Sequence, residues 1–420
     1  MSSRYEALRG MEDILPGEVE KWQWVEENAR IFFESRSYKE IRTPLLEHTD
    51  LFVRSVGESS DIVNKEMFSF EDRGGRNVTL RPEMTASVAR AVIEKGLLKQ
   101  AKSLRLYYLG PMFRAERPQA GRKRQFHQVG IEIINESDGA ADFECITALA
   151  GFFKYLSLED WVIRINDLGD AEVQKKTAEG LKKYFEQVKK QLCSDCQWRL
   201  TKNVLRIFDC KNAVCQPVIE KAPWDQIAPL SGPFQELMQK LQAHHLPLKV
   251  DRRLVRGLDY YNGAVFEVAC QGLGAQDAVA GGGRYDRLYG DLGSSRTPCT
   301  GFSIGMERLL TALEKSGSQL ESKIRSKRVY LALLDSGCKI QGEFNRAALA
   351  LRQQGVRIEM TAGETSLSKH LKKANKLNVR YALLLGNEEM QKGIWVLKDL
   401  DQKTQQDLKW DGIVSHFQGV

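Results

Sequence analysis

The chain has 420 residues, of which 42% are hydrophobic and 28% are charged, and this predicts two or three domains with a sizeable apolar core. No apolar run reaches the ~18 residues of a membrane span, and the first residues lead directly into mixed polar sequence, unlike a secretory signal. We therefore expect a cytoplasmic protein with no membrane contact. Eight cysteines in a chain of this length do not indicate a disulfide framework.

The net charge of +7 is unevenly distributed. Residues 321–420 hold 17 Lys or Arg and 11 Asp or Glu, and so carry +6 of it. A basic terminal module is a candidate nucleic-acid surface, although an ordinary solvated surface can have the same composition.

In the first half of the chain, a helix is predicted over 22–35, where apolar residues recur at helical spacing: Trp22, Val25, Ala29, Phe32 and Phe33. A strand over 38–43 ends at Pro44, which cannot extend a ladder from the inside. The later elements are strands over 104–109 and 129–134, a helix over 143–155, strands joined by Gly-rich turns over 262–285, and a strand running into a helix over 300–313. Strands with few regular crossovers favour an α+β fold, an antiparallel sheet with helices packed on it.

Two changes of pattern divide the chain. Between about 170 and 245, Lys/Glu-rich helical patterns broken by prolines predict a helical insertion. From 328 onward, strands alternate with helices, which predicts a small α/β domain: strands over 329–334, 356–360, 381–385 and 394–400, and helices over 339–354 and 366–378. We expect one domain over 1–325, including the insertion, and a second over 326–420.

The densest group of charges lies over 114–128, between two predicted strands. Residues 114–124 contain five cations and one anion, and we expect them to form a hairpin loop. Arg114, on the strand before the loop, could hold a phosphate through two parallel hydrogen bonds, and the tip could meet a polyanion. A solvated charged hairpin would contain the same residues.

A second segment, 301–309, has glycines around a strand and then a helix that opens with Glu307 and Arg308. A cation at a helix start opposes the helix dipole, and an anion bound there would resolve the conflict. Otherwise Arg308 is a surface arginine on an amphipathic helix.

Three shorter segments carry polar groups in glycine- or proline-containing contexts. In 80–85, Glu83 and Thr85 could together hold an ammonium group, while Thr85 also fits a helix N-cap. Segments 254–261 and 280–286 combine arginine, tyrosine and glycine, and the glycines at 281–283 would allow close backbone approach or a turn with positive φ.

Together these segments resemble the class II aminoacyl-tRNA synthetases, and specifically those for histidine. Segment 114–128 is similar to the second class-defining motif, 301–309 to the third, and 31–51 to the degenerate first motif of the dimer interface. Segments 256–261 and 281–286 are similar to the two signatures of the histidine enzymes. The matches follow the family's order, although Met84 stands where Gly is expected and Lys123 where an aromatic residue is common.

The resemblance implies ATP-dependent ligation of L-histidine to tRNA(His) through a histidyl-adenylate, with release of AMP and pyrophosphate. It implies a homodimer that uses Mg²⁺ with the nucleotide. Arg114 would hold the α-phosphate of ATP, Arg308 the γ-phosphate, and Arg256 would stabilise charge on the α-phosphate during attack. Arg114 and Arg256 would thus be catalytic, and the other ATP-binding residues would be Glu116, Arg122 and Phe126.

The same resemblance implies a histidine pocket. Glu83, Thr85 and Gln128 would bind the α-ammonium group, and Glu132 and Tyr261 would bind the imidazole edge. The other residues around the amino acid would be Met84, Arg256, Tyr260 and Tyr285. Polar partners of a side chain give sharp selectivity, and we see no separate editing domain.

The C-terminal domain resembles the family's anticodon-binding module. Its helix over 366–378 is predicted to turn Leu367, Leu371, Ala374 and Leu377 toward the sheet. Another face carries Lys369, Lys372, Lys373 and Lys376. These lysines, together with Gln119 and Arg124 of the hairpin, would bind tRNA, and a solvated lysine face is the alternative.

Cys193-x2-Cys196 and Cys210-x4-Cys215 have a spacing similar to that of a zinc ribbon. They fall in the insertion, where the activation chemistry needs no metal. We therefore expect buried free thiols and no protein-bound metal.

Two rival functions share the fold. A non-catalytic, histidine-sensing paralogue typically lacks the catalytic arginines or the C-terminal module, and this chain keeps Arg114, Arg256, Arg308 and residues 328–420. A class II synthetase for threonine, proline or glycine is disfavoured by the Tyr260-Tyr261 signature.

Overall fold

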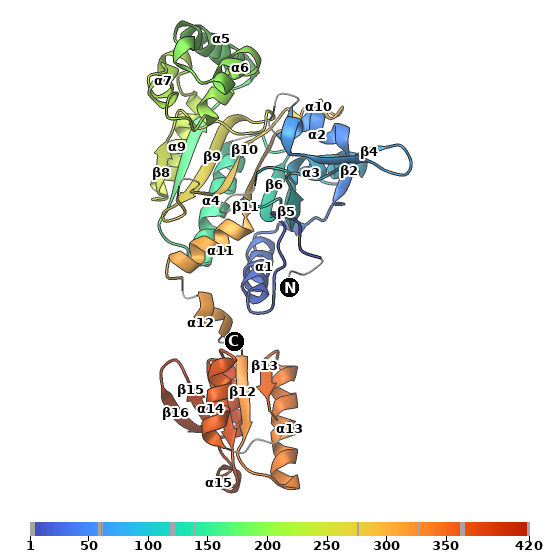
Figure 1. Ribbon diagram of the computed structural model, residues 1–420, viewed down its shortest axis with the longest axis vertical. Helices are drawn as coiled ribbons and strands as arrows, with labels where there is room; N and C mark the ends of the chain where they lie inside the picture. The colour runs from blue at the N-terminus through green and yellow to red at the C-terminus, as the bar shows by residue number, and fades with distance from the viewer. Residues whose placement is uncertain are drawn as a thin grey trace. The chain divides into compact units, whose positions relative to one another are not determined.

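The computed structural model describes residues 5–57, 60, 62–117, 122–137, 139–274, 277–318, 320–325, 328–361 and 366–417. The chain divides into two compact units, Met1–Ser318 and Gln319–Val420 (Figure 1). Within the described ranges, every helix is too short or too polar to cross a membrane.

The first unit is built on an eight-stranded sheet with the order β1-β5-β6-β11-β10-β9-β7-β8. The central neighbours are antiparallel, and the outermost pairs, β1 with β5 and β7 with β8, are parallel. The strands are β1 Lys39–Glu40, β5 Leu104–Phe113, β6 Gln125–Ile134, β7 Trp161–Asp167, β8 Leu248–Val250, β9 Asn262–Cys270, β10 Ala278–Arg284 and β11 Cys299–Gly305.

Helices α1 (Val19–Glu34), α4 (Gly139–Tyr155) and α11 (Met306–Lys315) pack against one another and the sheet. Phe33 of α1 lies 5.1 Å from Phe152 of α4 and 6.3 Å from Phe302 of β11, measured between ring centroids. Because successive residues of a strand point to opposite faces, the neighbours of Phe302, Gly301 and Ser303, face the other side of the sheet.

That other side is covered by α3 (Thr85–Glu94) and α10 (Leu288–Asp291), whose apolar residues form a core cluster with tyrosines of the sheet and of 260–261. A three-stranded sheet lies next to α2 (Thr49–Val56), in the order β2 (Leu46–His48), β4 (Asn77–Leu80), β3 (Phe68–Glu71). The short turns η1 (Ile62–Glu66) and η2 (Leu97–Lys99) complete this region.

The segment between β7 and β8 is helical and has its own core. Apolar side chains such as Leu181, Phe185, Ile207 and Phe208 are buried there together with cysteines. Its elements are α5 Ala171–Gln187, η3 Lys189–Gln191, α6 Ser194–Lys202, η4 Val204–Asp209, α7 Gln216–Glu220, α8 Trp224–Ile227 and α9 Gly232–Ala243.

The second unit is an α/β sandwich around the sheet β13-β12-β14-β15-β16. Strands β13, β12 and β14 are parallel, and β15 and β16 are antiparallel. Helices α13 and α16 contribute to the core on one face of β12 and α14 to the core on the other. The elements are α12 Leu320–Arg325, β12 Arg328–Leu333, α13 Cys338–Gln353, β13 Arg357–Met360, α14 Leu367–Lys376, β14 Tyr381–Leu385, α15 Asn387–Lys392, β15 Trp395–Asp399, β16 Thr404–Leu408 and α16 Trp410–Phe417.

The α+β fold class and the buried face of the first helix are confirmed. The strand predicted over 38–43 is wrong in length, since β1 covers only Lys39–Glu40 and the carbonyl of Thr43 accepts a hydrogen bond from buried Arg81 (2.9 Å) instead of joining a ladder. The glycines at 281–283 lie inside β10 and form no turn.

The predicted inward face of α14 is partly wrong. Ala374 is buried, but Leu367, in the first turn, is 38% exposed. His370 takes an inward position, with Nδ1 2.9 Å from the hydroxyl of Tyr330 and Nε2 3.1 Å from the carbonyl of Leu333. A residue that hydrogen-bonds at both ring nitrogens can be buried at little cost.

Candidate active site

A buried carboxylate, Glu132 of β6, lies at the centre of the candidate site. The Thr85 hydroxyl donates to its Oε1 (2.7 Å), and the Tyr285 hydroxyl donates to its Oε2. Burial raises the pKa of Glu132 to about 8, although both hydroxyl donors act in the opposite direction. The group is therefore a carboxyl that can be neutral near physiological pH.

A second buried carboxylate, Glu83, lies two residues before the first residue of helix α3. Its two oxygens accept hydrogen bonds from the backbone N–H groups of Thr85 (2.7 Å) and Ala86 (2.9 Å). The interpretation of Thr85 as the N-cap is therefore wrong, because the Glu83 side chain fills that role and frees the Thr85 hydroxyl for Glu132. Burial raises the pKa of Glu83, and the charge of Arg114 opposes the shift.

Aromatic side chains surround the two carboxylates. Tyr260 donates to Glu83 Oε2 (3.4 Å), and its ring lies 5.7 Å from Tyr285 and 4.7 Å from Tyr261. Met84 is buried in the same cluster. These walls exclude water, which strengthens the polar interactions inside.

Glycines at two strand positions make space for the polar groups. A Cβ atom at Gly301 of β11 would overlap the Glu132 carboxylate, and one at Gly281 of β10 would overlap the Arg256 guanidinium. Gln128 of β6, four residues before Glu132, pairs with Gly305 of β11, and its side-chain amide donates to the Ser303 hydroxyl (3.3 Å). The absence of side chains at these two strand positions thus leaves room for the Glu132 carboxylate and the Arg256 guanidinium.

Arg256 lies between this buried cluster and a group of charged residues that includes Glu267 and Arg308. Its guanidinium donates to Glu267 of β9 (3.0 Å) and lies 6.0 Å from the ring centroid of Tyr261. Burial raises the pKa of Tyr261 to about 12, and the Arg256 charge opposes that rise.

Arg308, in the first turn of α11, donates to the carbonyl of Ala278 (2.6 Å). Burial lowers its pKa, the charge of Arg122 lowers it further, and Glu116 and Glu267 raise it. Arg122 in turn donates to Glu116 (2.9 Å). Glu267 is therefore close enough to act on both Arg256 and Arg308.

Arg114 lies at the end of β5. Its Nε donates to the carbonyl of Pro82 (3.0 Å), and its guanidinium lies 5.1 Å from the ring centroid of Phe126 on β6. The backbone N–H of Arg124 donates to the carbonyl of Gly10 (2.7 Å), and this bond connects the hairpin to the N-terminal segment. Gln119 lies outside the described residues.

The structure thus brings together the predicted residues around Glu83 and Glu132. It also places Arg256, Arg308, Arg122 and Glu116 in one group of interacting charges. Residues not predicted also join the site: Glu267, Ser303 and the buried Tyr108, whose hydroxyl lies against Gly130. Only strand register places Glu267 opposite Gly281, and alternation along β9 alone does not mark it as a site residue.

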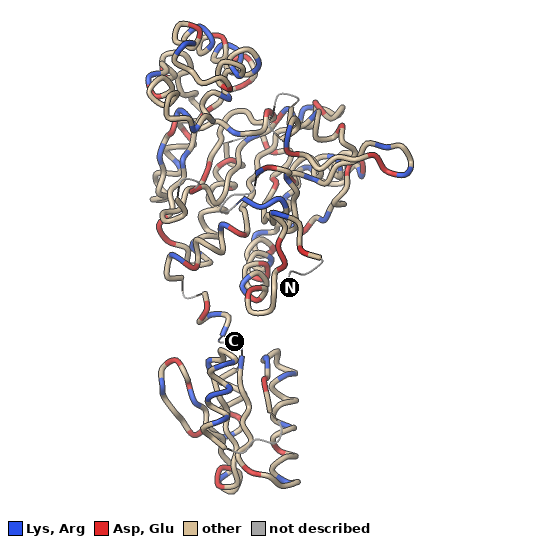
Figure 2. Tube along the Cα trace, viewed as in Figure 1, with Lys and Arg blue, Asp and Glu red and all other residues tan. Residues whose placement is uncertain are grey.

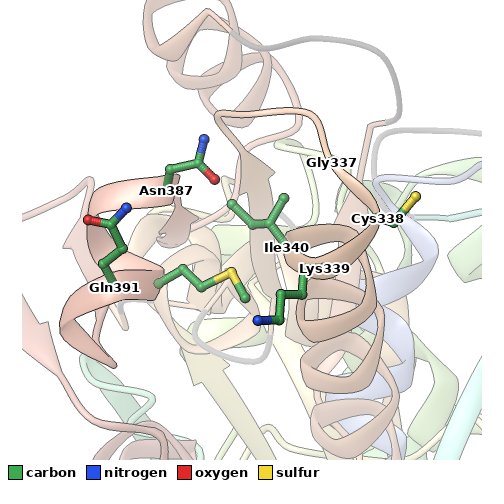
Figure 3. Close-up of a pocket in the computed structure, with 7 residues that line it drawn as sticks. Gly337, Cys338, Lys339, Ile340, Asn387 and Gln391 are labelled. Carbon is green, nitrogen blue, oxygen red and sulfur yellow. The ribbon is translucent and has the colours of Figure 1, made fainter.

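The predicted lysines lie in the second unit. Lys369, Lys372, Lys373 and Lys376 are all exposed on α14. Figure 2 marks where lysine and arginine residues fall along the trace of this unit. The same unit has a separate cavity of about 420 Å³ between the start of α13 and helix α15 (Figure 3). Its polar lining includes Lys339, Asn387 and Gln391, and no predicted site residue borders it.

Comparison with known proteins decides the family. A family model described as histidyl-tRNA synthetase matches residues 10–197 and 171–309, and one described as an anticodon binding domain matches 328–419. The histidine–tRNA ligase of Thermotoga sp. (strain RQ2) is 42% identical over 409 residues, covering 97% of each chain. This chain belongs to the histidyl-tRNA synthetase family.

Other members of the histidyl-tRNA synthetase family agree. The histidine–tRNA ligase of Desulforamulus reducens is 42% identical over 403 residues, covering 95% of this chain and 96% of the relative. The crystal structure of the apo histidyl-tRNA synthetase of S. aureus has a TM-score of 0.72 at 29% identity, covering 99% of this chain and 100% of the other. The resemblance to a class II synthetase for histidine is thereby confirmed.

Proposed function

We propose that this chain ligates L-histidine to tRNA(His) in two ATP-dependent steps, through a histidyl-adenylate. The observation that carries the proposal is a cluster of polar side chains around two buried carboxylates, Glu83 and Glu132, beside an arginine, Arg256, that shares a carboxylate neighbour with Arg308. An amino acid in the pocket would have its carboxylate next to bound phosphates.

The pocket suits histidine because it offers polar partners at both ends of the amino acid. Glu83, Thr85 and Gln128 take the α-ammonium group, and Glu132 and Tyr261 take the imidazole edge, with Met84, Tyr260 and Tyr285 around them. When Glu132 is protonated, its carboxyl group can donate to an imidazole nitrogen, and when it is ionised it can accept from one. An amino acid without that match would leave these buried groups unpaired, which is strongly unfavourable.

The first step is an in-line attack of the histidine carboxylate on the α-phosphorus of ATP. A carboxylate oxygen–phosphorus bond forms, the bond to the β-phosphate oxygen breaks, and pyrophosphate leaves. Arg114 and Arg256 stabilise the charge that develops on the α-phosphate oxygens, and Arg308 holds the γ-phosphate. Glu116, Arg122 and Phe126 seat the rest of the nucleotide.

Mg²⁺ bound to the polyphosphate would shield its negative charge. The carboxylates near Arg308 already have arginine partners, since Glu267 pairs with Arg256 and Glu116 with Arg122. This arrangement fits an ion that is bound mainly by phosphate oxygens.

In the second step, a hydroxyl of the tRNA 3′-terminal ribose attacks the acyl carbon, the acyl–phosphate bond breaks and AMP leaves. Gln119 and Arg124 of the hairpin contact the tRNA, and the four lysines of α14 contact its anticodon region. Phosphate contacts of this kind supply much of the affinity for nucleic acid. We assign residues 1–325 to catalysis, with 170–245 as an insertion, and 326–420 to anticodon binding.

A homodimer is the assembly that we propose, in the cytoplasm. Large apolar side chains are exposed in and beside segment 31–51 and the small sheet: Ile31 (53%), Leu45 (43%), Leu46 (44%) and Phe70 (49%). Large apolar side chains left exposed at such positions suit a protein interface.

The test is ATP–pyrophosphate exchange with each of the twenty amino acids. We expect exchange with histidine alone, followed by acylation of tRNA(His). Exchange with another amino acid would indicate a sister synthetase, and no exchange at all would indicate a non-catalytic paralogue.

A further inference from the structure

Four cysteines of the helical insertion converge on one point. The sulfur atoms of Cys193, Cys196, Cys210 and Cys215 all lie within 4.8 Å of one another. They come from three places along the chain: the start of α6, the end of η4 and the start of α7. In the part of the chain that the structure describes, this is the one group of three or more potential metal-ligating side chains.

The spacing of the sulfurs fits tetrahedral coordination. Four thiolates at the usual zinc–sulfur distance of about 2.3 Å are separated from one another by about 3.8 Å. The Cys193 and Cys210 sulfurs are 3.8 Å apart. A disulfide requires about 2.05 Å, and all four cysteines are free thiols in this structure.

The backbone around the sulfurs is arranged as it is around bound thiolates. The N–H of Cys193 donates to the sulfur of Cys215 (3.2 Å), and the N–H of Asn212 donates to that of Cys210 (3.4 Å). Hydrogen bonds from outside the first ligand shell orient ligands and stabilise their charge. Neutral thiols in an apolar core need no such donors.

The other buried cysteines of the chain provide an internal comparison. Cys145, Cys270 and Cys299 are also buried and free, yet none belongs to such a group. Cys299, for example, lies within an apolar core cluster of the first unit, as expected of a small hydrophobic residue. Simple burial therefore does not account for four sulfurs at one point.

We propose that Cys193, Cys196, Cys210 and Cys215 bind one structural Zn²⁺ ion, in place of the free thiols expected from the sequence. Four protein ligands close the coordination sphere, so the ion has no open position for catalysis. The elements that it joins are short, with nine residues in α6, six in η4 and five in α7, and short elements around a small core gain most from a metal cross-link.

The ion would also stabilise one wall of the active site. Arg206 of η4 donates to Asp259 (2.8 Å), which lies in the same segment as Arg256 and Tyr260. Val255 of that segment packs against the cysteine-containing core. Loss of the ion should therefore loosen the segment that holds Arg256, without removing any group that contacts substrate.

The decisive measurement is metal content. The full chain, purified under reducing conditions, supplied with Zn²⁺ and freed of excess by gel filtration, should retain about one zinc ion per chain. Co²⁺ in place of Zn²⁺ should give the intense thiolate-to-cobalt absorption of a tetrahedral site. Less than about 0.1 ion per chain, or four thiols that react freely with a thiol reagent in the zinc-supplied protein, would overturn the proposal.

Variants locate the site. Cys193→Ser and Cys210→Ser should each lose the cobalt absorption and most of the zinc, whereas Cys338→Ser, which removes an exposed thiol of the other unit, should keep both. If a variant fails to fold, the metal content and cobalt spectrum of the unaltered chain still decide the question. Zinc retained by both variants, or iron found in place of zinc by elemental analysis, would contradict the assignment.

Discussion

Two cationic regions of this protein differ in how they are held. The arginines of the candidate active site, Arg114, Arg256 and Arg308, are partly buried, and each donates to a fixed acceptor on the protein. The lysines of α14 are exposed side chains on a single helix. Preorganised groups in a water-poor site act on developing charge, whereas solvated cations attract a polyanion in a salt-dependent way.

This difference has a consequence for substitutions. A substitution of an active-site arginine should slow adenylate formation. A substitution on α14 should lower the affinity for tRNA while amino-acid activation continues. The substitutions below test that separation.

The largest effect is expected for Arg256→Ala. Adenylate formation should fall by roughly 100- to 1000-fold, because the positive charge beside the α-phosphate is lost, while histidine affinity should change much less. Exchange kinetics and calorimetric histidine binding measure the two quantities. Arg253→Ala, a nearby exposed arginine paired with Glu220 and Asp251, is the matched control. Equal losses of binding and adenylate formation would refute the catalytic role.

A smaller effect is expected for the combined change of Lys372, Lys373 and Lys376 to Ala. Affinity for tRNA(His) should fall by about tenfold, and the dependence of binding on salt concentration should become shallower. ATP–pyrophosphate exchange should be unchanged.

A control variant tests whether position or net charge matters. It changes three other exposed cations of the same unit, Lys339, Arg346 and Lys392, to Ala. If this control weakens binding equally and flattens the salt dependence equally, the face of α14 has no special role.

A still smaller effect concerns pH and Glu132→Gln. Since the folded pKa of Glu132 is raised above its unfolded value, to about 8, the folded chain binds more protons between these values, and stability falls as pH rises through this range. Glutamine does not titrate. The quantity to compare is the melting temperature of the variant minus that of the parent. This difference should be roughly 2–4 °C larger at pH 8 than at pH 5.

This measurement uses protein without substrates, followed by scanning calorimetry. Glu186→Gln, at an exposed position on α5, should show no such change between the two pH values. A relative stability of Glu132→Gln that is independent of pH would show that the carboxyl does not titrate in this range.

The smallest effect is expected for Gly342→Ala in α13. A Cβ atom there would meet no other atom within 4 Å, and alanine should stabilise the helix by about 0.5–1 kcal/mol. Amides of α13 that open through helix unfolding should exchange with solvent about two- to fivefold more slowly, with no change in histidine activation. Faster exchange would show that the glycine is needed for packing.

The sequence was sufficient for features that depend on local pattern. Helical spacing predicted the buried face of α1, since Trp22, Val25 and Phe33 face the core. Alternation of strands and helices predicted the α/β class of the second unit. The elements α15 and β16, which are largely polar and exposed, and the C-terminal helix α16 were not predicted.

Features that depend on register or tertiary contact were not predictable in this way. Glu83 rather than Thr85 caps α3, because Glu132 from a distant strand competes for the Thr85 hydroxyl. Glu267 becomes the partner of Arg256 only when β9 pairs with β10. The motif resemblance named candidate residues around one pocket, but it contained no information on these partners.

The bare backbone of β10 and β11 sets a limit on how the pocket can change. Gly281 and Gly301 already have the smallest side chain possible, and any larger residue would collide with Arg256 or Glu132. Mutation at these two positions can only reduce the room available to a ligand. A variant that accepts a bulkier amino acid must therefore have smaller residues in place of the surrounding tyrosines or Met84. No substitution at Gly281 or Gly301 can enlarge the site.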